Sequence, residues 1–328
     1  MTMICGVFVT AILAALAVSV ISVDYYPDSG DIDDLPLLES RIVNGDIATE
    51  GQFCYFVRVV AYGGPQNAIM QHRCGGSIIS SCWVLTAGHC YIANPNASQP
   101  ITYHIEAGSI ISGEPQQLQI IMNSDAFLHP GYNLDTLEND ICLIKTDPFV
   151  FNQYVCSLEI APRFWNSESY AGNTITAMGF GYITDNGPVS EFLLWTTLTV
   201  IPKAECQSIY TEAEKFDLPR TCFCAVDMDG QTPVSSICSG DSGGPVVIMK
   251  EGKPIEVGLV SFAPPFTSND GCSANPQGFV DVAMFHDWIQ WIMMREHNYE
   301  FKYEKVKKQK EKHKENSLGN KILGLLFG

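Results

Sequence analysis

The sequence predicts an all-β fold of antiparallel strands that is closed by one C-terminal helix. Short β-branched and aromatic runs recur between residues 42 and 282, and Gly, Pro and Asn turns separate them. Many short strands at this spacing are typical of a barrel or a sandwich. Nothing in the composition of the 328 residues divides the chain into similar halves, so one core with appended ends is expected.

Each expected element follows from its own residues. Clear strands are expected at 55–60, 83–86 and 174–177. Residues 246–249 and 255–262 flank a Glu-Gly turn, which predicts a β-hairpin. Near the end of the region, apolar side chains share one helical face, which predicts a docking helix. These side chains are Phe285, Trp288, Ile289, Ile292 and Met293.

The two ends of the chain differ from this core. Residues 1–23 carry no charge and are mostly apolar and small, which is typical of a secretory signal peptide. An uncleaved membrane anchor is the alternative, because about 20 apolar residues can span a bilayer. Residues 24–41 are acidic and are expected to be a pro-segment. Residues 298–328 form a lysine-rich tail that is expected to be solvated, with a surface-binding arm as the alternative.

Cysteine content and charge narrow the class of protein. Twelve cysteines in a chain with a signal peptide indicate a secreted, extracellular protein with disulfides. Removal of the signal peptide would leave no stable membrane span in the mature form. Cys5 lies in the signal segment, so an odd number of cysteines remains. The sequon at Asn96 predicts a glycan. Residues 42–298 carry a formal net charge of −16, which argues against nucleic-acid binding.

Three segments supply the groups that a nucleophilic serine needs. Ser242 lies in the run Gly-Asp-Ser-Gly-Gly-Pro, and a serine hydroxyl is a poor nucleophile without a base and a group that orients the base. His89 ends one apolar strand, and Asp140 begins another. A core histidine, an N-cap aspartate or a turn serine is ordinary alone. The three together provide a nucleophile, a base and an acid that orients the base.

The order His, Asp, Ser and its flanks resemble the chymotrypsin-like (trypsin-fold, S1 family) serine endopeptidases. The resemblance covers Arg41 to about His297, which defines an expected protease domain at 42–297, and it implies two six-stranded antiparallel β-barrels with a C-terminal helix. Gly51-Gln52-Phe53 is weakly similar to arthropod digestive or venom members. The motifs in register are Arg41-Ile42-Val43-Asn44-Gly45, Trp83-Val84-Leu85, Thr86-Ala87-Gly88-His89-Cys90, Asn139-Asp140-Ile141-Cys142-Leu143-Ile144, Gly179-Phe180-Gly181 and Ser261-Phe262.

The resemblance implies a role for each residue of the set. His89 is the general base, Asp140 orients it, and Ser242 is the nucleophile. The backbone N–H groups of Gly240 and Ser242 form the oxyanion hole. Protein or peptide substrates are implied, with no metal and no organic cofactor.

The resemblance also implies activation by proteolysis. Cleavage after Arg41 by a trypsin-like protease frees the ammonium group of Ile42, which pairs with Asp241 and assembles the oxyanion hole and the substrate pocket. A buried acid needs such a partner. The implied partners are therefore an activating protease, substrates and protein inhibitors.

The substrate pocket is the least determined part of the resemblance. Ser236 lies at the implied floor and, not being an acid, cannot neutralise Lys or Arg. The position of an alignment gap determines whether Gln277 or Gly278 is the second residue of the pocket floor. Gly278 is preferred, and it predicts a chymotrypsin-like preference for large apolar P1 residues. An elastase-like preference for small residues is the alternative. The implied wall consists of Ser261, Phe262 and Ala263.

Three disulfides are implied by the resemblance: Cys74–Cys90, Cys206–Cys224 and Cys238–Cys272. Cys222 is an alternative partner for Cys206. Cys142 is expected to be a small buried hydrophobe. The pairing of Cys54, Cys82, Cys142, Cys156 and Cys222 stays open, with Cys54–Cys156 as a further candidate bridge.

A non-catalytic homologue that keeps the fold for binding is the second hypothesis for function. Its usual sign is the loss of a triad or oxyanion-hole residue. The sequence retains all of them.

Overall fold

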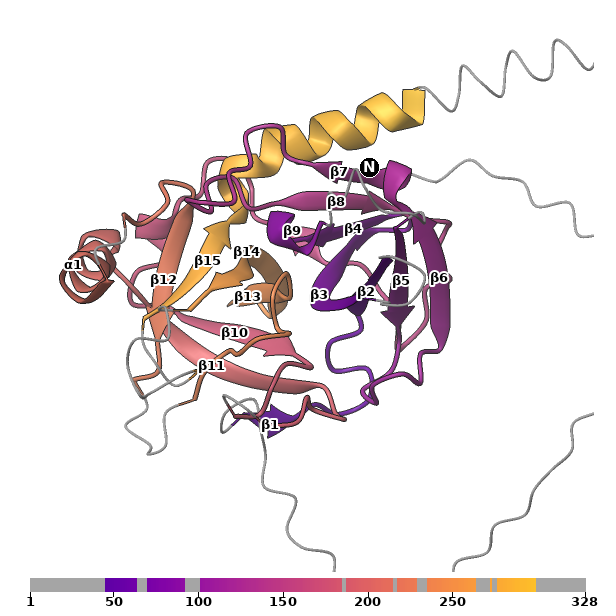
Figure 1. Cartoon of the computed structure of the whole chain (residues 1–328), viewed down its shortest axis with the longest axis horizontal. Helices are drawn as coiled ribbons and strands as arrows, with labels where there is room; N and C mark the ends of the chain where they lie inside the picture. The colour runs from indigo at the N-terminus through magenta and orange to yellow at the C-terminus, as the bar shows by residue number, and fades with distance from the viewer. Residues whose placement is uncertain are drawn as a thin grey trace, which may run out of the picture.

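The computed structural model describes residues 45–63, 70–91, 101–184, 187–214, 217–228, 235–263, 272 and 276–298. Two antiparallel sheets lie side by side, and a helix over residues 286–298 crosses the top of both (Figure 1). The expected signal peptide, the pro-segment, the activation bond between Arg41 and Ile42, Asn96 and the lysine-rich tail lie outside the described residues.

The first sheet is an open half-barrel of seven strands, in the order β6-β5-β2-β3-β4-β8-β7. Along β5 every second residue is buried, as in a half-buried strand, whereas all four residues of β4 are buried. The strands are β2 (Phe56–Gly63), β3 (Met70–Ser80), β4 (Trp83–Thr86), β5 (Thr102–Ala107), β6 (Gln117–Met122), β7 (Ala126–Leu128) and β8 (Cys142–Lys145).

The second sheet is a closed barrel. Six strands follow the order β11-β10-β13-β14-β15-β12, and pairing between β11 and β12 closes the ring. β1 extends the sheet beside β11, and β9 pairs with β14. The strands are β1 (Asp46–Ile47), β9 (Glu159–Ile160), β10 (Thr174–Gly179), β11 (Leu194–Ile201), β12 (Cys222–Val226), β13 (Pro245–Lys250), β14 (Lys253–Phe262) and β15 (Gln277–Asp281).

The all-β prediction, with two barrel-like sheets and a C-terminal helix, is confirmed. The expected hairpin is β13–β14, and its two turn residues both have positive φ, 52° at Glu251 and 78° at Gly252. That combination defines the tight turn that suits twisted antiparallel strands. The apolar face of the helix packs between the sheets, where Ile289 and Ile292 contact a cluster that includes Leu85 and Leu259.

Helix α1 (Lys203–Glu214) was not expected from the sequence. Apolar residues follow a helical spacing only near the end of the domain. Helix α1 is mostly polar, and among its residues with described side chains Cys206 and Tyr210 are buried, one turn apart. Two anchors are too few for a periodic signal. The 3-10 turns are η2 (Gly88–Cys90), η3 (Asn123–Asp125), η4 (Ser167–Ser169) and η6 (Val282–Phe285). No helix among the described residues is long and apolar enough to cross a membrane.

The disulfides brace both sheets. The three pairings implied by the resemblance are present, and the further candidate Cys54–Cys156 also forms. Among the described residues, Cys142 and Cys222 are free and buried. Burial raises the pKa of the Cys142 thiol, which agrees with its expected place as a small core residue.

Glu256 on β14 is a fully buried carboxyl group between the two sheets. The hydroxyl of Ser77 on β3 lies 2.8 Å from each of its oxygens and so links the sheets. Burial raises the pKa of Glu256 from 4.5 to about 8, and the Ser77 hydrogen bond offsets only part of that rise. The folded protein therefore holds a proton that the unfolded chain releases, so stability falls as pH rises between these two values.

We expect Glu256→Gln to remove this pH dependence. From about pH 4.5 to about pH 8 the wild type loses up to about 1.4 kcal/mol of unfolding free energy per pH unit through this group, whereas glutamine does not titrate. Urea unfolding near pH 5 and near pH 8 measures the difference, with exposed Glu159→Gln as the matched control. Equal pH slopes for the wild type and Glu256→Gln would contradict the expectation.

Candidate active site

His89 lies in turn η2, directly after strand β4. Its Nδ1 is 2.8 Å from Oδ2 of Asp140, and its backbone N–H donates to Oδ1 of the same carboxylate at 2.7 Å. Gly88 permits this approach, because a β-carbon there would lie 2.9 Å from the backbone nitrogen of Ile141. One carboxylate therefore holds His89 at two points, its imidazole ring and its backbone N–H.

Asp140 lies just before β8 and is fully buried. The residue before it, Asn139, has a positive φ of 57°. Besides His89, its Oδ2 accepts a hydrogen bond of 2.6 Å from the Ser261 hydroxyl. The sequence placed Ser261 only in the pocket wall, and no motif indicated this second contact, which depends on β14 of the other sheet meeting the Asp140 loop.

Ser242 lies in a loop that both sheets hold. Its carbonyl accepts from the N–H of Gly75 on β3 at 2.7 Å, and Gly243 donates to Val260 on β14 at 2.8 Å. Cys90, the neighbour of His89, has its sulfur 3.7 Å from the same Ser242 carbonyl. The predicted base and nucleophile segments are therefore adjacent, although no direct hydrogen bond joins His89 to Ser242 in the described structure.

The backbone around Ser242 is suited to binding an anion. Gly240 has φ of 98°, a conformation that favours glycine, and the N–H groups of Gly240 and Ser242 have no acceptor among the described residues. Free N–H groups next to a serine hydroxyl are what an oxyanion hole requires.

Asp241 is fully buried beneath this loop. Its carboxylate accepts from the N–H of Gly181 at 2.7 Å and from that of Cys238 at 2.9 Å. Burial raises its pKa to about 6, against the lowering effect of those two hydrogen bonds. No cationic side chain pairs with it among the described residues. A β-carbon on Gly181 would lie 2.6 Å from the carboxylate, so this glycine leaves room for the acid.

A cavity of about 150 Å³ opens beside Ser242. It contains the predicted wall residues, and the Cys238–Cys272 disulfide forms one side. The lining residues carry no acid. They are Ile237, Cys238, Ser239, Ser242, Val260, Ser261, Phe262, Ala263 and Cys272.

The lining includes none of the expected floor residues, Ser236, Gln277 and Gly278. A β-carbon on Gly278 would overlap the Phe262 ring. Gln277, by contrast, is fully buried and accepts a hydrogen bond of 3.0 Å from the N–H of Ile237, a lining residue. Of the two alternatives, Gln277 is therefore the one whose side chain is hydrogen-bonded to a lining residue. Its Nε2 and the Oγ of fully buried Ser236 have no partner among the described residues.

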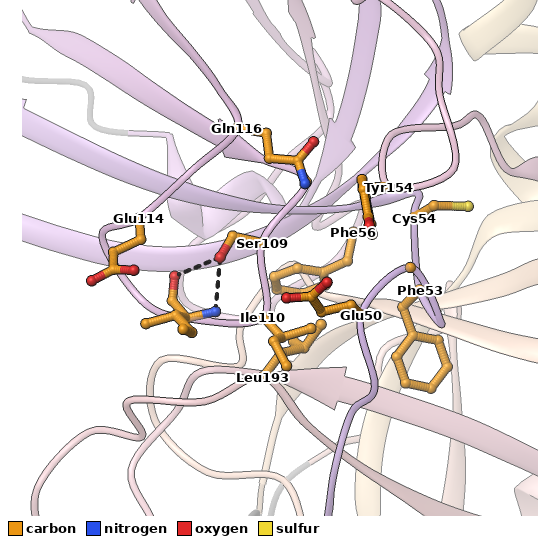
Figure 2. Close-up of a pocket in the computed structure, with 13 residues that line it drawn as sticks. Glu50, Phe53, Cys54, Phe56, Ser109, Ile110, Glu114, Gln116, Tyr154 and Leu193 are labelled. Atoms are coloured by element: carbon orange, nitrogen blue, oxygen red, sulfur yellow. Dashed lines mark hydrogen bonds between the residues drawn. The ribbon is translucent and has the colours of Figure 1, made fainter.

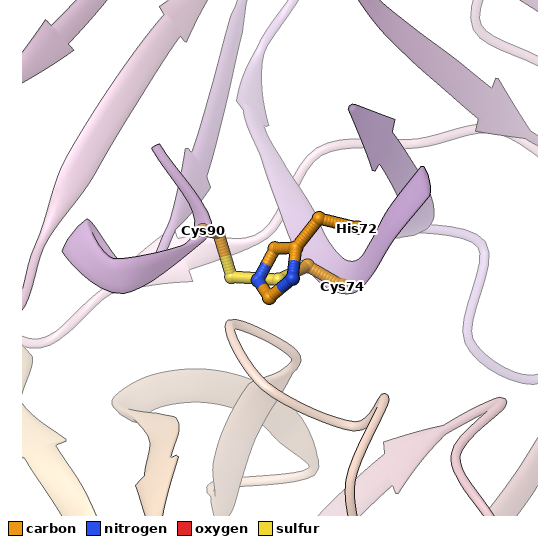
Figure 3. A group of neighbouring side chains, drawn as sticks. All are labelled: His72, Cys74 and Cys90. Carbon is orange, nitrogen blue, oxygen red and sulfur yellow. A yellow bond between two sulfur atoms is a disulfide. The ribbon is translucent and has the colours of Figure 1, made fainter. Parts of the chain in front are cut away.

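His72 lies beside the Cys74–Cys90 disulfide at the edge of the site (Figure 3). The three residues are close enough to suggest a metal site, but both sulfurs are bonded to each other and so do not offer thiolates. The His72 ring is 6.5 Å from that of His89, and burial together with His89 lowers the pKa of His72.

The chain is similar to known proteins in sequence and in fold. The family model described as Trypsin matches residues 42–289. Serine protease 1 and Serine protease 2 of Drosophila melanogaster are each 33% identical over 254 residues, covering 77% of this chain and 86% of theirs. Protein masquerade of the same species is 28% identical, but the match covers 23% of that protein. The crystal structure titled HL collagenase is 27% identical, with a TM-score of 0.60 over 77% of this chain and 98% of its own.

Proposed function

Because the chain belongs to the trypsin family of serine proteases, we propose that it is a secreted serine endopeptidase, made as a zymogen. The observation that carries the proposal is the double hydrogen bond between His89 and Asp140 next to the Ser242 loop. A neutral histidine with its Nδ1 proton fixed on a carboxylate is oriented to take a proton through Nε2.

The proposed chemistry is acyl transfer. His89 removes the proton of Ser242 as its oxygen attacks the substrate carbonyl, and Asp140 stabilises the resulting imidazolium. The N–H groups of Gly240 and Ser242 donate to the oxyanion, where one donor contributes about 3 kcal/mol. His89 then returns the proton to the leaving amine, and water hydrolyses the acyl-enzyme. The substrates are proteins or peptides.

Activation is proposed to follow removal of the signal peptide at 1–23 and cleavage after Arg41 by a trypsin-like protease. The new ammonium group of Ile42 would pair with Asp241. Support comes from Asp241 itself, a fully buried carboxylate without a cationic partner among the described residues. A glycan at Asn96 and inhibition by proteins are part of the same proposal.

The proposed P1 residue is large, with an apolar body and a hydrogen-bonding tip. The cavity walls at Val260 and Phe262 are apolar, whereas buried Ser236 and Gln277, which adjoin the lining residue Ile237 by sequence and by a hydrogen bond, have unpartnered polar atoms. Tyrosine fits this combination better than phenylalanine, because a buried polar group gains from each hydrogen bond it completes. The chymotrypsin-like preference is thus kept and made more specific, ahead of an elastase-like one.

A fluorophosphonate probe tests the enzymatic function. We expect it to label Ser242 in the full chain only after cleavage at Arg41, because the oxyanion hole is assembled by the freed Ile42. Peptide mapping by mass spectrometry identifies the labelled residue, and Ser242→Ala is the control. An unlabelled sample with proven cleavage at Arg41 would instead support the non-catalytic homologue.

A further inference from the structure

A second cavity, of about 230 Å³, lies away from the Ser242 loop. It is formed between residues 50–56 before and within β2, the connection from β5 to β6, and Leu193 ahead of β11 (Figure 2). Its lining combines aromatic rings with carboxylates and carries no cationic side chain. The residues are Glu50, Gly51, Phe53, Cys54, Phe56, Gly108, Ser109, Ile110, Ile111, Glu114, Gln116, Tyr154 and Leu193.

The two carboxylates of this cavity, on Glu50 and Glu114, are exposed to solvent. Glu50 and Glu114 form no ion pair within the described part of the chain, whereas Glu106 pairs with Arg58 and Glu138 with Arg220. Residues 42–298 as a whole are strongly acidic, so no general excess of cations screens the two carboxylates. Figure 2 shows Glu50 among the aromatic side chains, on a different segment from Glu114.

The complementary ligand is a cation on an apolar stem. The aromatic rings of Phe53, Phe56 and Tyr154 favour an apolar stem and, at their faces, a cation. The volume is below the roughly 300–1,000 Å³ of pockets that enclose whole small molecules, so a single side chain is the fitting size. We propose that this cavity is an accessory site that binds a lysine or arginine side chain of a protein substrate.

Phe56 lines this cavity and also lies beside Gly75, whose backbone holds the Ser242 loop. A β-carbon on Gly75 would lie 3.1 Å from the Phe56 ring, and Gly75 donates to the carbonyl of Ser242. The Phe56 ring also lies 5.7 Å from that of Phe180, beside Gly181. Substituting Phe56 would therefore disturb catalysis, whereas Glu50 and Glu114 can be changed without touching that support.

Binding is tested first, without reference to activity. Nα-acetyl-lysine methylamide is titrated into the full chain carrying Ser242→Ala, with amide NMR shifts as the readout and the norleucine analogue as the neutral probe. We expect saturable shifts in residues 50–56 and 108–116 for lysine only, and their loss in Glu50→Gln/Glu114→Gln. Shifts that persist in this double variant, or that norleucine produces equally, would overturn the site.

A second, kinetic experiment rests on the proposed function. It distinguishes a cavity that binds a side chain of a protein substrate from one that binds a free amine. A lysine-rich polypeptide and its acetylated form are compared as substrates of the activated enzyme. We expect the double variant to lower kcat/KM for the unmodified polypeptide about fivefold and to leave a short neutral peptide unchanged. Glu159→Gln/Glu168→Gln, exposed acids outside the cavity, should change neither value. An equal loss in both double variants would mean general charge attraction and would overturn the proposal. Binding of the lysine probe with no kinetic effect would assign the cavity to free amines instead.

Discussion

Replacing Asp140 with asparagine is expected to lower kcat of the activated enzyme by about 10⁴-fold while leaving the fold intact. The effect follows from the different partners of the two Asp140 carboxylate oxygens. Oδ1 accepts from the backbone N–H of His89, a group that can only donate, so the amide oxygen of asparagine must stay there. The amide NH₂ then takes the place of Oδ2, facing Nδ1 of His89.

An NH₂ group in that place donates to Nδ1 and so fixes the imidazole proton on Nε2. His89 then has no lone pair with which to accept the proton of Ser242. Steady-state hydrolysis of a short peptide measures kcat, and the fluorophosphonate labelling rate reports the same defect without product release.

Ser261→Ala is the matched control for this substitution. Ser261 donates to the same oxygen of Asp140 at 2.6 Å, but its loss leaves the tautomer of His89 unchanged. We expect a reduction of about tenfold or less, corresponding to one hydrogen bond. Similar losses in Asp140→Asn and Ser261→Ala would show that the carboxylate acts by packing and not by setting the proton position.

The sequence was sufficient to predict those parts of the fold that depend on residues close together in the chain. The β13–β14 hairpin has its turn residues between two apolar runs, and the C-terminal helix has a continuous apolar face. The segments of His89, Asp140 and Ser242 were placed through their flanks, which carry the glycines that the backbone requires at Gly88 and Gly240.

Contacts between the two sheets could not be predicted in this way. The Ser261 hydrogen bond to Asp140 joins residues 121 positions apart, and the link from Ser77 to Glu256 joins residues 179 apart. Neither pair has a local spacing that could reveal it. The Gln277 or Gly278 ambiguity has the same origin, since the register of β15 against β14 decides it, through the pairing of Phe262 with Gly278.

Peptides with arginine at P1 are expected to be cleaved about 10³-fold less efficiently than those with tyrosine, as kcat/KM. A buried charge without a partner costs about 3–5 kcal/mol. The cavity beside Ser242 offers no acid among its lining residues, and the proposed floor residues, Ser236 and Gln277, are neutral. A panel of peptides that differ only at P1 measures the ratio.

The same panel separates tyrosine from phenylalanine and assigns the floor. We expect tyrosine to exceed phenylalanine about tenfold, because its hydroxyl completes a hydrogen bond to a donor that is otherwise unpaired. Gln277→Leu should reduce that ratio to about one, and Ser236→Asp should raise arginine cleavage by supplying the missing carboxylate. Fluorophosphonate labelling of each variant confirms that the catalytic residues remain competent. If labelled Gln277→Leu kept the tyrosine preference, the Gln277 amide would not contact the P1 side chain. Ser236 would then be the only one of the two residues that bonds to the P1 hydroxyl.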